Sequence, residues 1–177
     1  MKESGEPYPM DEIPTNPLAT ILCAVDVATQ NPLAMAMLQK SSELEYVTRE
    51  LVAFTKRLGF IDLVIRSDGE PAITAIVDKF LAAVKKDVGN ATIKVRPEKT
   101  PRYSSASLGA VGAMQSAVQG QVRTLKTALE LKLKTMAKTN WAVWPWMVRH
   151  AAWLLERYQM RANGRTSFED CFGLPYS

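Results

Sequence analysis

Asp68 is the residue best placed to do chemistry, because it lies between an apolar, strand-like run at 60–66 and a helix that opens at Pro71. Functional groups commonly sit where a strand of an α/β sheet ends. A carboxylate at such a point can ligate Mg²⁺ through oxygen. The same side chain can instead cap the helix or shape the turn of residues 67–70. The local sequence leaves both roles open.

The other candidate side chains favour structural roles. Asp26 lies in an apolar run at 20–28, which favours a solvent-facing or turn-supporting position. His150 is a lone histidine on an aromatic helix, so we expect it to be packed. No serine or cysteine has a base partner nearby in sequence, so nucleophilic catalysis is not indicated. With only Cys23 and Cys171 beside one histidine, a four-ligand zinc site within the chain is excluded and a disulfide scaffold is not expected.

Basic residues gather in the middle of the chain. Residues 1–90 carry 9 Lys/Arg and 13 Asp/Glu, residues 91–140 carry 9 and 2, and residues 141–177 carry 4 and 3. The basic segment indicates an acidic partner, most commonly nucleic acid, or else a lysine-rich helix face in solvent. The candidate contacts to a DNA or RNA backbone are Lys94, Arg96, Lys99, Arg102, Arg123, Lys126 and Lys134.

Length and composition bound the remaining possibilities. The chain has 177 residues, 47% of them hydrophobic, which excludes disorder as the main state and fits one compact domain. Its apolar runs are far shorter than the roughly 20 residues of a membrane-spanning helix, and the polar N-terminus does not resemble a secretory signal. A reduced, intracellular setting is therefore the default expectation. We expect a flexible proline-rich arm at 1–18, a domain at 19–161 and a loop or tail at 162–177.

Hydrophobic periodicity predicts an α/β fold, with helices packed on a mixed sheet. Two apolar runs joined by a short turn predict a hairpin of residues 20–28 and 33–39. The run at 60–66 predicts a strand buried on both faces, and 92–98 alternates like a strand. The segments with helical spacing are 43–58, 71–87, 111–136 and 143–158.

Five segments occur in the order of a known family: AVDVATQNPLAMAM, DLVIRSDGEPAI, SLGAVGAMQSAVQGQVRTLK, WPWMVRHAAWLLERY and GRTSFEDCFGLPY. Together they resemble the integrase catalytic core of copia-type LTR retrotransposons. The resemblance spans roughly residues 20–176. It implies an RNase H-like fold, DNA integration and a nuclear location. It also implies a DDE site, in which three carboxylates hold two Mg²⁺ ions for phosphodiester hydrolysis and strand transfer.

On this resemblance, Asp68 matches the second catalytic aspartate of the family. Counting back from Arg123, the position of the family's glutamate falls on Gly112, which carries no ligand. The first aspartate belongs to a strand upstream of residues 20–28, where this chain has its proline-rich arm and, as the one upstream aspartate, Asp11. The resemblance therefore implies a degenerate core without its first strand. Because one acidic ligand cannot hold two metals in register, we expect impaired Mg²⁺ binding and nucleic-acid binding without strand transfer.

Four tryptophans support a competing hypothesis without nucleic acid: Trp141, Trp144, Trp146 and Trp153. Three of them lie within six residues and cannot all face inward on one helix, so at least one is expected to be exposed. The helix of residues 141–158 is then a protein-interaction surface, and a homo-oligomer is one form it could take. If the tryptophans form the domain's own core, this hypothesis loses its support. A third reading is a transposon relic without function.

Overall fold

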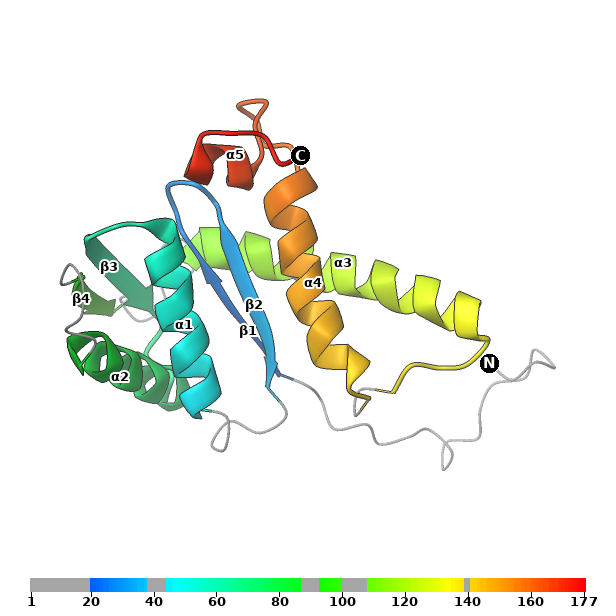
Figure 1. The fold of residues 1–177 in the computed structure, drawn as a ribbon. Coiled ribbons are helices and arrows are strands. Elements are labelled where there is room, and N and C mark those ends of the chain that lie inside the picture. Colours follow the sequence, from blue (N-terminus) through cyan, green and yellow to red (C-terminus); the bar gives the residue numbers. More distant parts are fainter. Residues whose placement is uncertain (1–19, 38–43, 87–92, 100–107, 139–140) are drawn as a thin grey trace.

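The computed structural model describes residues 20–37, 44–86, 93–99, 108–138 and 141–177. These ranges contain four strands and five helices, which confirms the α/β class (Figure 1). The expected arm at 1–18 and Arg102 of the predicted basic set lie outside the described residues. No helix within the described ranges is long and apolar enough to cross a membrane. The elements are β1 (Thr20–Val25), β2 (Pro32–Met37), α1 (Leu44–Leu58), β3 (Asp62–Ser67), α2 (Pro71–Lys86), β4 (Lys94–Lys99), α3 (Gly109–Leu133), α4 (Val143–Tyr158) and α5 (Ser167–Phe172).

The strands form two separate two-stranded sheets. β1 and β2 make the predicted antiparallel hairpin, with Thr20 opposite Met37 and Val25 opposite Pro32. β3 and β4 pair in parallel, with Asp62 beside Lys94. We expected one mixed sheet, whereas in the described residues the two pairs share no hydrogen-bonded neighbour. The antiparallel and parallel pairings are both present, but they are divided between two sheets.

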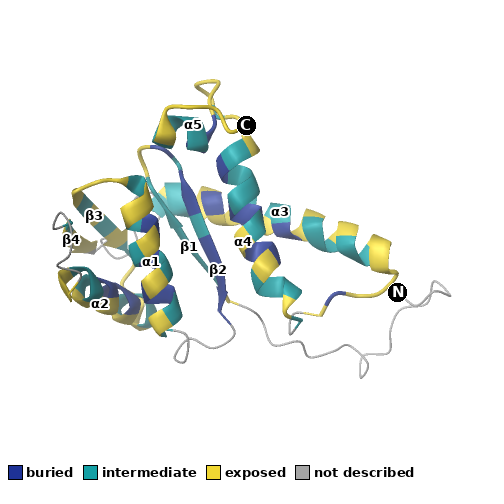
Figure 2. Ribbon diagram, viewed as in Figure 1, coloured by how far each residue is buried: buried dark blue, intermediate teal, exposed yellow. Residues whose placement is uncertain are grey.

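The hairpin separates two hydrophobic cores, because successive side chains of a strand point to opposite faces. On one face, Ile21 and Cys23 of β1 and Ala34 of β2 pack against α3 and α4. On the other face, Leu22 of β1 and Met35 of β2 pack against α1 and α2. Ile65 of β3 and Val95 of β4 join this second core. β2 is buried along almost its whole length, and Figure 2 shows it as the dark centre of the molecule.

The helices begin and end close to where the sequence predicts them. Val47, Leu51 and Phe54 are buried at steps of four and three, so one side of α1 faces the second core. Pro71 is the first residue of α2, and Pro145 lies in the first turn of α4. The first turn is where a helix accepts proline. α3 buries Met114, Val118 and Val122, while its C-terminal part, ending at the exposed Leu131 and Leu133, extends away from the body (Figure 1).

The prediction of a doubly buried strand at 60–66 is wrong. Along β3 exposed and partly buried residues alternate, and Val64 keeps 51% of its surface exposed. The reason is that Asp62, Val64 and Arg66 share one side of the strand, which faces solvent, while Leu63 and Ile65 point inward. β3 is thus a half-buried strand rather than a central one.

The prediction of a loop after residue 161 is wrong for residues 167–172, which form α5. Thr166 caps this helix: its side chain accepts a hydrogen bond from the Glu169 amide, and the Glu169 side chain accepts one from the Thr166 amide. Gly173 closes it in the left-handed conformation, at φ 78°. A six-residue helix is too short to show hydrophobic periodicity, which explains why the pattern missed it.

Candidate functional site

Asp68 lies in the turn between β3 and α2, as expected, and it is exposed. Its Oδ1 accepts a hydrogen bond of 3.3 Å from the backbone amide of Glu70. A side-chain oxygen that bonds an amide two residues on is typical of an Asx turn. The structure therefore provides direct evidence for the turn-shaping role of Asp68 at the entrance to α2.

The residues that the structure describes do not assemble a metal site around Asp68. Within those residues, no three His, Cys, Asp or Glu side chains come close enough together to hold a metal ion. Gly112 occupies the first turn of α3, and a Cβ placed there would meet no atom within 4 Å. Position 112 therefore has room for a side chain and lacks one with a ligand. The described donor set does not fit a pair of Mg²⁺ ions.

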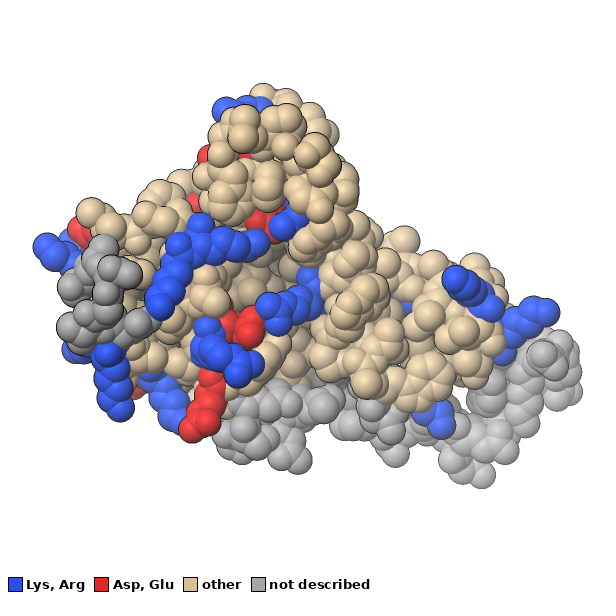
Figure 3. All heavy atoms as spheres, viewed as in Figure 1, with Lys and Arg blue, Asp and Glu red and all other residues tan. Residues whose placement is uncertain are grey.

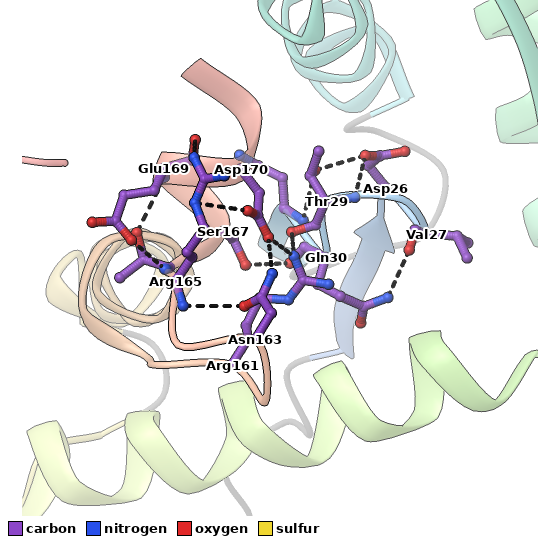
Figure 4. A network of polar contacts seen from close by, with 12 residues as sticks. Asp26, Val27, Thr29, Gln30, Arg161, Asn163, Arg165, Ser167, Glu169 and Asp170 are labelled. Atoms are coloured by element: carbon purple, nitrogen blue, oxygen red, sulfur yellow. Dashed lines mark hydrogen bonds and ion pairs between the residues drawn. The ribbon is translucent and has the colours of Figure 1, made fainter. Parts of the chain in front are cut away.

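Asp26 supports the hairpin turn. Its Oδ2 accepts hydrogen bonds from the amide of Thr29, at 2.9 Å, and from the Thr29 hydroxyl, at 2.6 Å (Figure 4). β1 ends at Val25, so Asp26 is the first residue of the turn rather than part of the strand. These contacts confirm the turn-supporting role among the two that the sequence left open.

The hairpin turn is also tied to the C-terminal segment (Figure 4). The Ser167 hydroxyl donates to the carbonyl of Gln30 at 3.0 Å, and the Arg161 guanidinium donates to the carbonyl of Thr29 at 3.1 Å. Arg161 also pairs with Asp170 of α5. Residues 161–170 therefore pack on the tip of the hairpin.

Neither cysteine is set up as a nucleophile, and both are free thiols. Burial raises the pKa of Cys23 from 9.0 to about 11. Burial likewise raises the pKa of Cys171, while the Arg57 charge opposes that rise. A raised pKa keeps the sulfur protonated at neutral pH, and the protonated form is the weak nucleophile.

His150 is packed between two tryptophans on α4, as predicted. Its ring stacks on Trp146 with the ring centres 4.5 Å apart, and on Trp153 at 5.4 Å. Trp146 is 57% exposed, which confirms that at least one tryptophan of this helix faces outward. The other tryptophans of the described part of α4, Trp144 and Trp153, are partly buried.

The predicted basic residues of β4 stand among acidic ones. Arg96 forms an ion pair with Asp62 across the parallel strands at 3.1 Å, and Arg66 pairs with Glu98 at the same distance. Lys94 is exposed on the same side of β4 as Arg96. The outward side of the β3–β4 pair thus carries both signs of charge, which weakens its attraction for phosphate.

The basic residues of α3 are better placed. Arg123 and Lys126 lie on one side of the helix, and Lys134 follows its last residue. Glu130 lies on the same side and forms an ion pair with Lys126, with 3.5 Å between the Lys126 Nζ and the Glu130 Oε1. The C-terminal end of α3 and β4 lie at opposite ends of the molecule (Figure 1), so the predicted set does not form one continuous strip.

Charge counting along the sequence missed two groups of charged residues. One is a buried carboxylate, Glu156, which bonds to Asn31 and Arg57 at the junction of β2, α1 and α4. The other is a concentration of Lys and Arg side chains over α1 and α2, visible on the face drawn in Figure 3. The segment 1–90 is acidic overall, so its count conceals the basic residues that these two helices bring together.

No protein-family model matches the sequence. No curated protein matches it either. Among solved structures, the chain is similar to one chain of the simian T-cell lymphotropic virus intasome in complex with the PP2A regulatory subunit B56 gamma, determined by cryo-electron microscopy. The TM-score is 0.61 and the sequence identity 14%, and the match covers 86% of this chain and 48% of the other. The chain thus shares its fold with part of one chain of this intasome complex and spans about half of the matching chain.

Proposed function

We propose that this chain is an integrase-core-like domain that binds the nucleic-acid backbone and does not catalyse strand transfer. The basic side of α3 carries the proposal: Arg123 and Lys126 on the helix and Lys134 at its end. The similarity in fold to part of a viral intasome supports it. The resemblance to copia-type integrase segments supports the same class of function, with a nuclear location as its corollary.

The geometry of α3 suits a sequence-independent contact. Arg123 and Lys134 are eleven residues apart, a separation of about 16 Å along a helix and about the rise of five base pairs. Both side chains are exposed, while Lys126 is partly screened by Glu130. Such a row would contact phosphates and read no bases. We therefore expect binding that depends strongly on salt and little on sequence.

Duplex DNA affinity across a salt series tests this proposal. The full chain is compared with Arg123→Ala/Lys126→Ala/Lys134→Ala, and with a charge-matched control, Lys85→Ala/Lys132→Ala/Lys138→Ala. When the affinity is plotted against the salt concentration, both as logarithms, backbone binding gives a slope of about −0.9 for each neutralised phosphate. We therefore expect the slope of the α3 variant to be shallower by about 2. The slope of the control variant should differ from that of the parent chain by less than the value of one phosphate contact, about 0.9.

Either of two results would overturn the proposal. One is no detectable binding at low salt by protein that circular dichroism shows to be folded. The other is an equal loss of slope in both triple variants, which would mean that total charge, and not the α3 side, sets the affinity.

We propose the absence of strand transfer because, among the residues that the structure describes, no set of carboxylates is placed to bind the metal ions. Asp68 alone cannot hold two Mg²⁺ ions, and position 112 is a glycine. Purified chain incubated with Mg²⁺ and labelled duplex should show no nicking or joining above a no-protein control. Mg²⁺-dependent nicking that Asp68→Asn abolishes would show that this part of the proposal is wrong.

A second candidate function rests on the exposure of Trp146. In this hypothesis α4 binds a protein partner, in the simplest case a second copy of the chain, through an exposed aromatic side chain. Light scattering after size exclusion should then give a dimer mass for the chain and a monomer mass for Trp146→Ala. A monomer in both cases would exclude self-association through α4.

A further inference from the structure

A groove of about 790 Å³ runs between α1 and α2, away from the proposed nucleic-acid side on α3. Its floor consists of small or apolar residues, among them Val52 and Ala53 of α1 and Ala82 and Ala83 of α2. The larger side chains of the two helices, such as Phe80, point down into the core. Because the surface residues between the helices are mostly alanines, a channel remains open above that core.

Four basic residues stand along the two sides of this groove. Arg49 and Lys56 belong to α1, and Lys79 and Lys86 to α2, and all four are exposed. The acidic residue among the described residues that line the groove is Glu45. Figure 3 shows Lys and Arg side chains gathered on the face that α1 and α2 form. The groove therefore pairs an apolar floor with strongly basic rims.

The Arg49 side chain lies mostly in solvent, with 71% of its surface exposed. Arg49 forms an ion pair with Glu50 of α1, at 3.8 Å. Glu50 is already held by Arg149 of α4, at 2.6 Å, so it offsets little of the Arg49 charge. The two cations on each helix are seven residues apart, which places them about 10.5 Å apart along its axis. Each rim thus carries two basic side chains two helical turns apart.

We propose that the α1–α2 groove docks an acidic, amphipathic helix of a partner protein. A helix laid in the groove would place its apolar stripe on the alanine and valine floor. Asp or Glu residues on either side of that stripe, seven positions apart, would meet the cations of each rim. The two cations of each rim are seven residues apart, which is about two turns of a helix. Acidic residues seven positions apart on the docked helix would therefore lie opposite them.

The apolar floor favours a helix over nucleic acid in this groove. A phosphate backbone would pair with the rim cations but would leave Val52 and the alanines facing water or charged groups. An amphipathic helix buries that floor and satisfies the rims together. The positive charge of the rims would attract either an acidic helix or a nucleic-acid backbone. The apolar floor of the groove favours the helix.

The test uses the full chain and a fluorescein-labelled peptide of about 14 residues, or four helical turns, with leucines on one stripe and glutamates beside it. One control peptide has lysines in place of the glutamates, and another has the same composition in scrambled order. Binding is followed by fluorescence anisotropy. We expect saturable binding of the acidic peptide that weakens as salt rises, and binding of neither control peptide.

Two rim variants locate the site: Arg49→Glu/Lys56→Glu and Lys79→Glu/Lys86→Glu. Each should weaken binding by about tenfold or more, because a double reversal turns attraction on one rim into repulsion. Ala82→Glu, at an exposed position of the floor, should weaken it without touching the rims. The matched control, Lys85→Glu/Lys132→Glu, changes the charge equally outside the groove lining and should stay within about twofold.

Three outcomes would overturn the inference. The acidic peptide could bind no better than its scrambled control. The control variant could lose as much affinity as the rim variants, which would show non-specific attraction. The rim variants could lose duplex DNA binding while the acidic peptide fails to bind, in which case the groove is a nucleic-acid surface. Circular dichroism on every variant confirms that each is folded.

Discussion

The side-chain amide of Asn31 donates a hydrogen bond of 2.7 Å to Oε1 of Glu156, joining residues 125 positions apart in the sequence. Glu156 is only 2% exposed, and its carboxylate also pairs with Arg57 of α1 at 3.0 Å and with the neighbouring Arg157. The Arg57 guanidinium in turn donates to Oδ1 of Asn31 at 3.1 Å. One buried carboxylate thus joins the start of β2, the end of α1 and the end of α4.

Replacing Glu156 by alanine should destabilise the chain by about 3 kcal/mol. The change would leave the Asn31 amide and the Arg157 guanidinium without an acceptor in a buried place and would remove the ion-pair partner of Arg57, and breaking a buried ion pair is strongly destabilising. Urea unfolding measures the effect. Asp78→Ala, which removes an exposed carboxylate of α2, serves as control and should change stability by less than about 0.5 kcal/mol. Equal effects of both substitutions would contradict this role of Glu156.

Replacing Asp26 by alanine should cost about 1 kcal/mol or somewhat more. The carboxylate accepts two hydrogen bonds from Thr29, and the turn it shapes also carries the contacts to Arg161 and Ser167. Thermal or urea unfolding gives the change in stability, and limited proteolysis of the C-terminal segment shows whether that segment loosens. Unchanged stability together with unchanged cleavage after residue 160 would contradict this view of the turn.

Two glycine-to-alanine substitutions should act in opposite directions. Gly120 lies inside α3, where a Cβ would meet no atom within 4 Å, so Gly120→Ala should stabilise the chain by about 1 kcal/mol. Gly173 ends α5 at φ 78°, a conformation that alanine resists, so Gly173→Ala should destabilise it by about 1 kcal/mol. Shifts of the unfolding midpoint at constant m measure both. A loss of stability in Gly120→Ala would mean that α3 packs more closely at this point than the structure has it.

The thiol of Cys23 should make stability fall at alkaline pH. Burial raises its pKa from 9.0 to about 11, so between these values the folded chain holds a proton that the unfolded chain has released. Its contribution to stability is therefore complete below about pH 9 and is lost as the pH rises through about 11. Urea unfolding between about pH 8 and 11 should show a smaller decline in Cys23→Ala than in the parent chain. Parallel declines would show that the thiol titrates alike in both states.

Local patterns in the sequence predicted much of the fold. The bounds of α4, Val143–Tyr158, agree with the prediction, because Asn140 marks a break before it and Pro145 is acceptable only in a first turn. α5 was missed although its capping box was readable, with Thr166 three residues before Glu169. The prediction that the β3 segment is buried on both faces was wrong because its hydrophobic residues outweighed the alternating Asp62 and Arg66.

The candidate site was harder to predict, since its properties depend on residues far apart in the chain. Counting charge along residues 91–140 could not show that Arg96 would face Asp62, which lies 34 residues earlier in the chain. Nor could it show that cations of α1 and α2 would line one groove within the acidic first half. Asp68 was located correctly in its turn, but its bond to the Glu70 amide belongs to the folded backbone.

The division of the strands into two sheets gives the molecule an uneven resistance to local opening. β2 is buried on both faces between two cores, whereas no residue of β3 is fully buried, and its partner β4 packs on β3 and on α2. Backbone amides of the β3–β4 pair should therefore exchange with deuterium long before those of β2, through a partial unfolding that leaves the hairpin intact. The turn that carries Asp68 follows β3 directly, so it belongs to the first part of the structure to open.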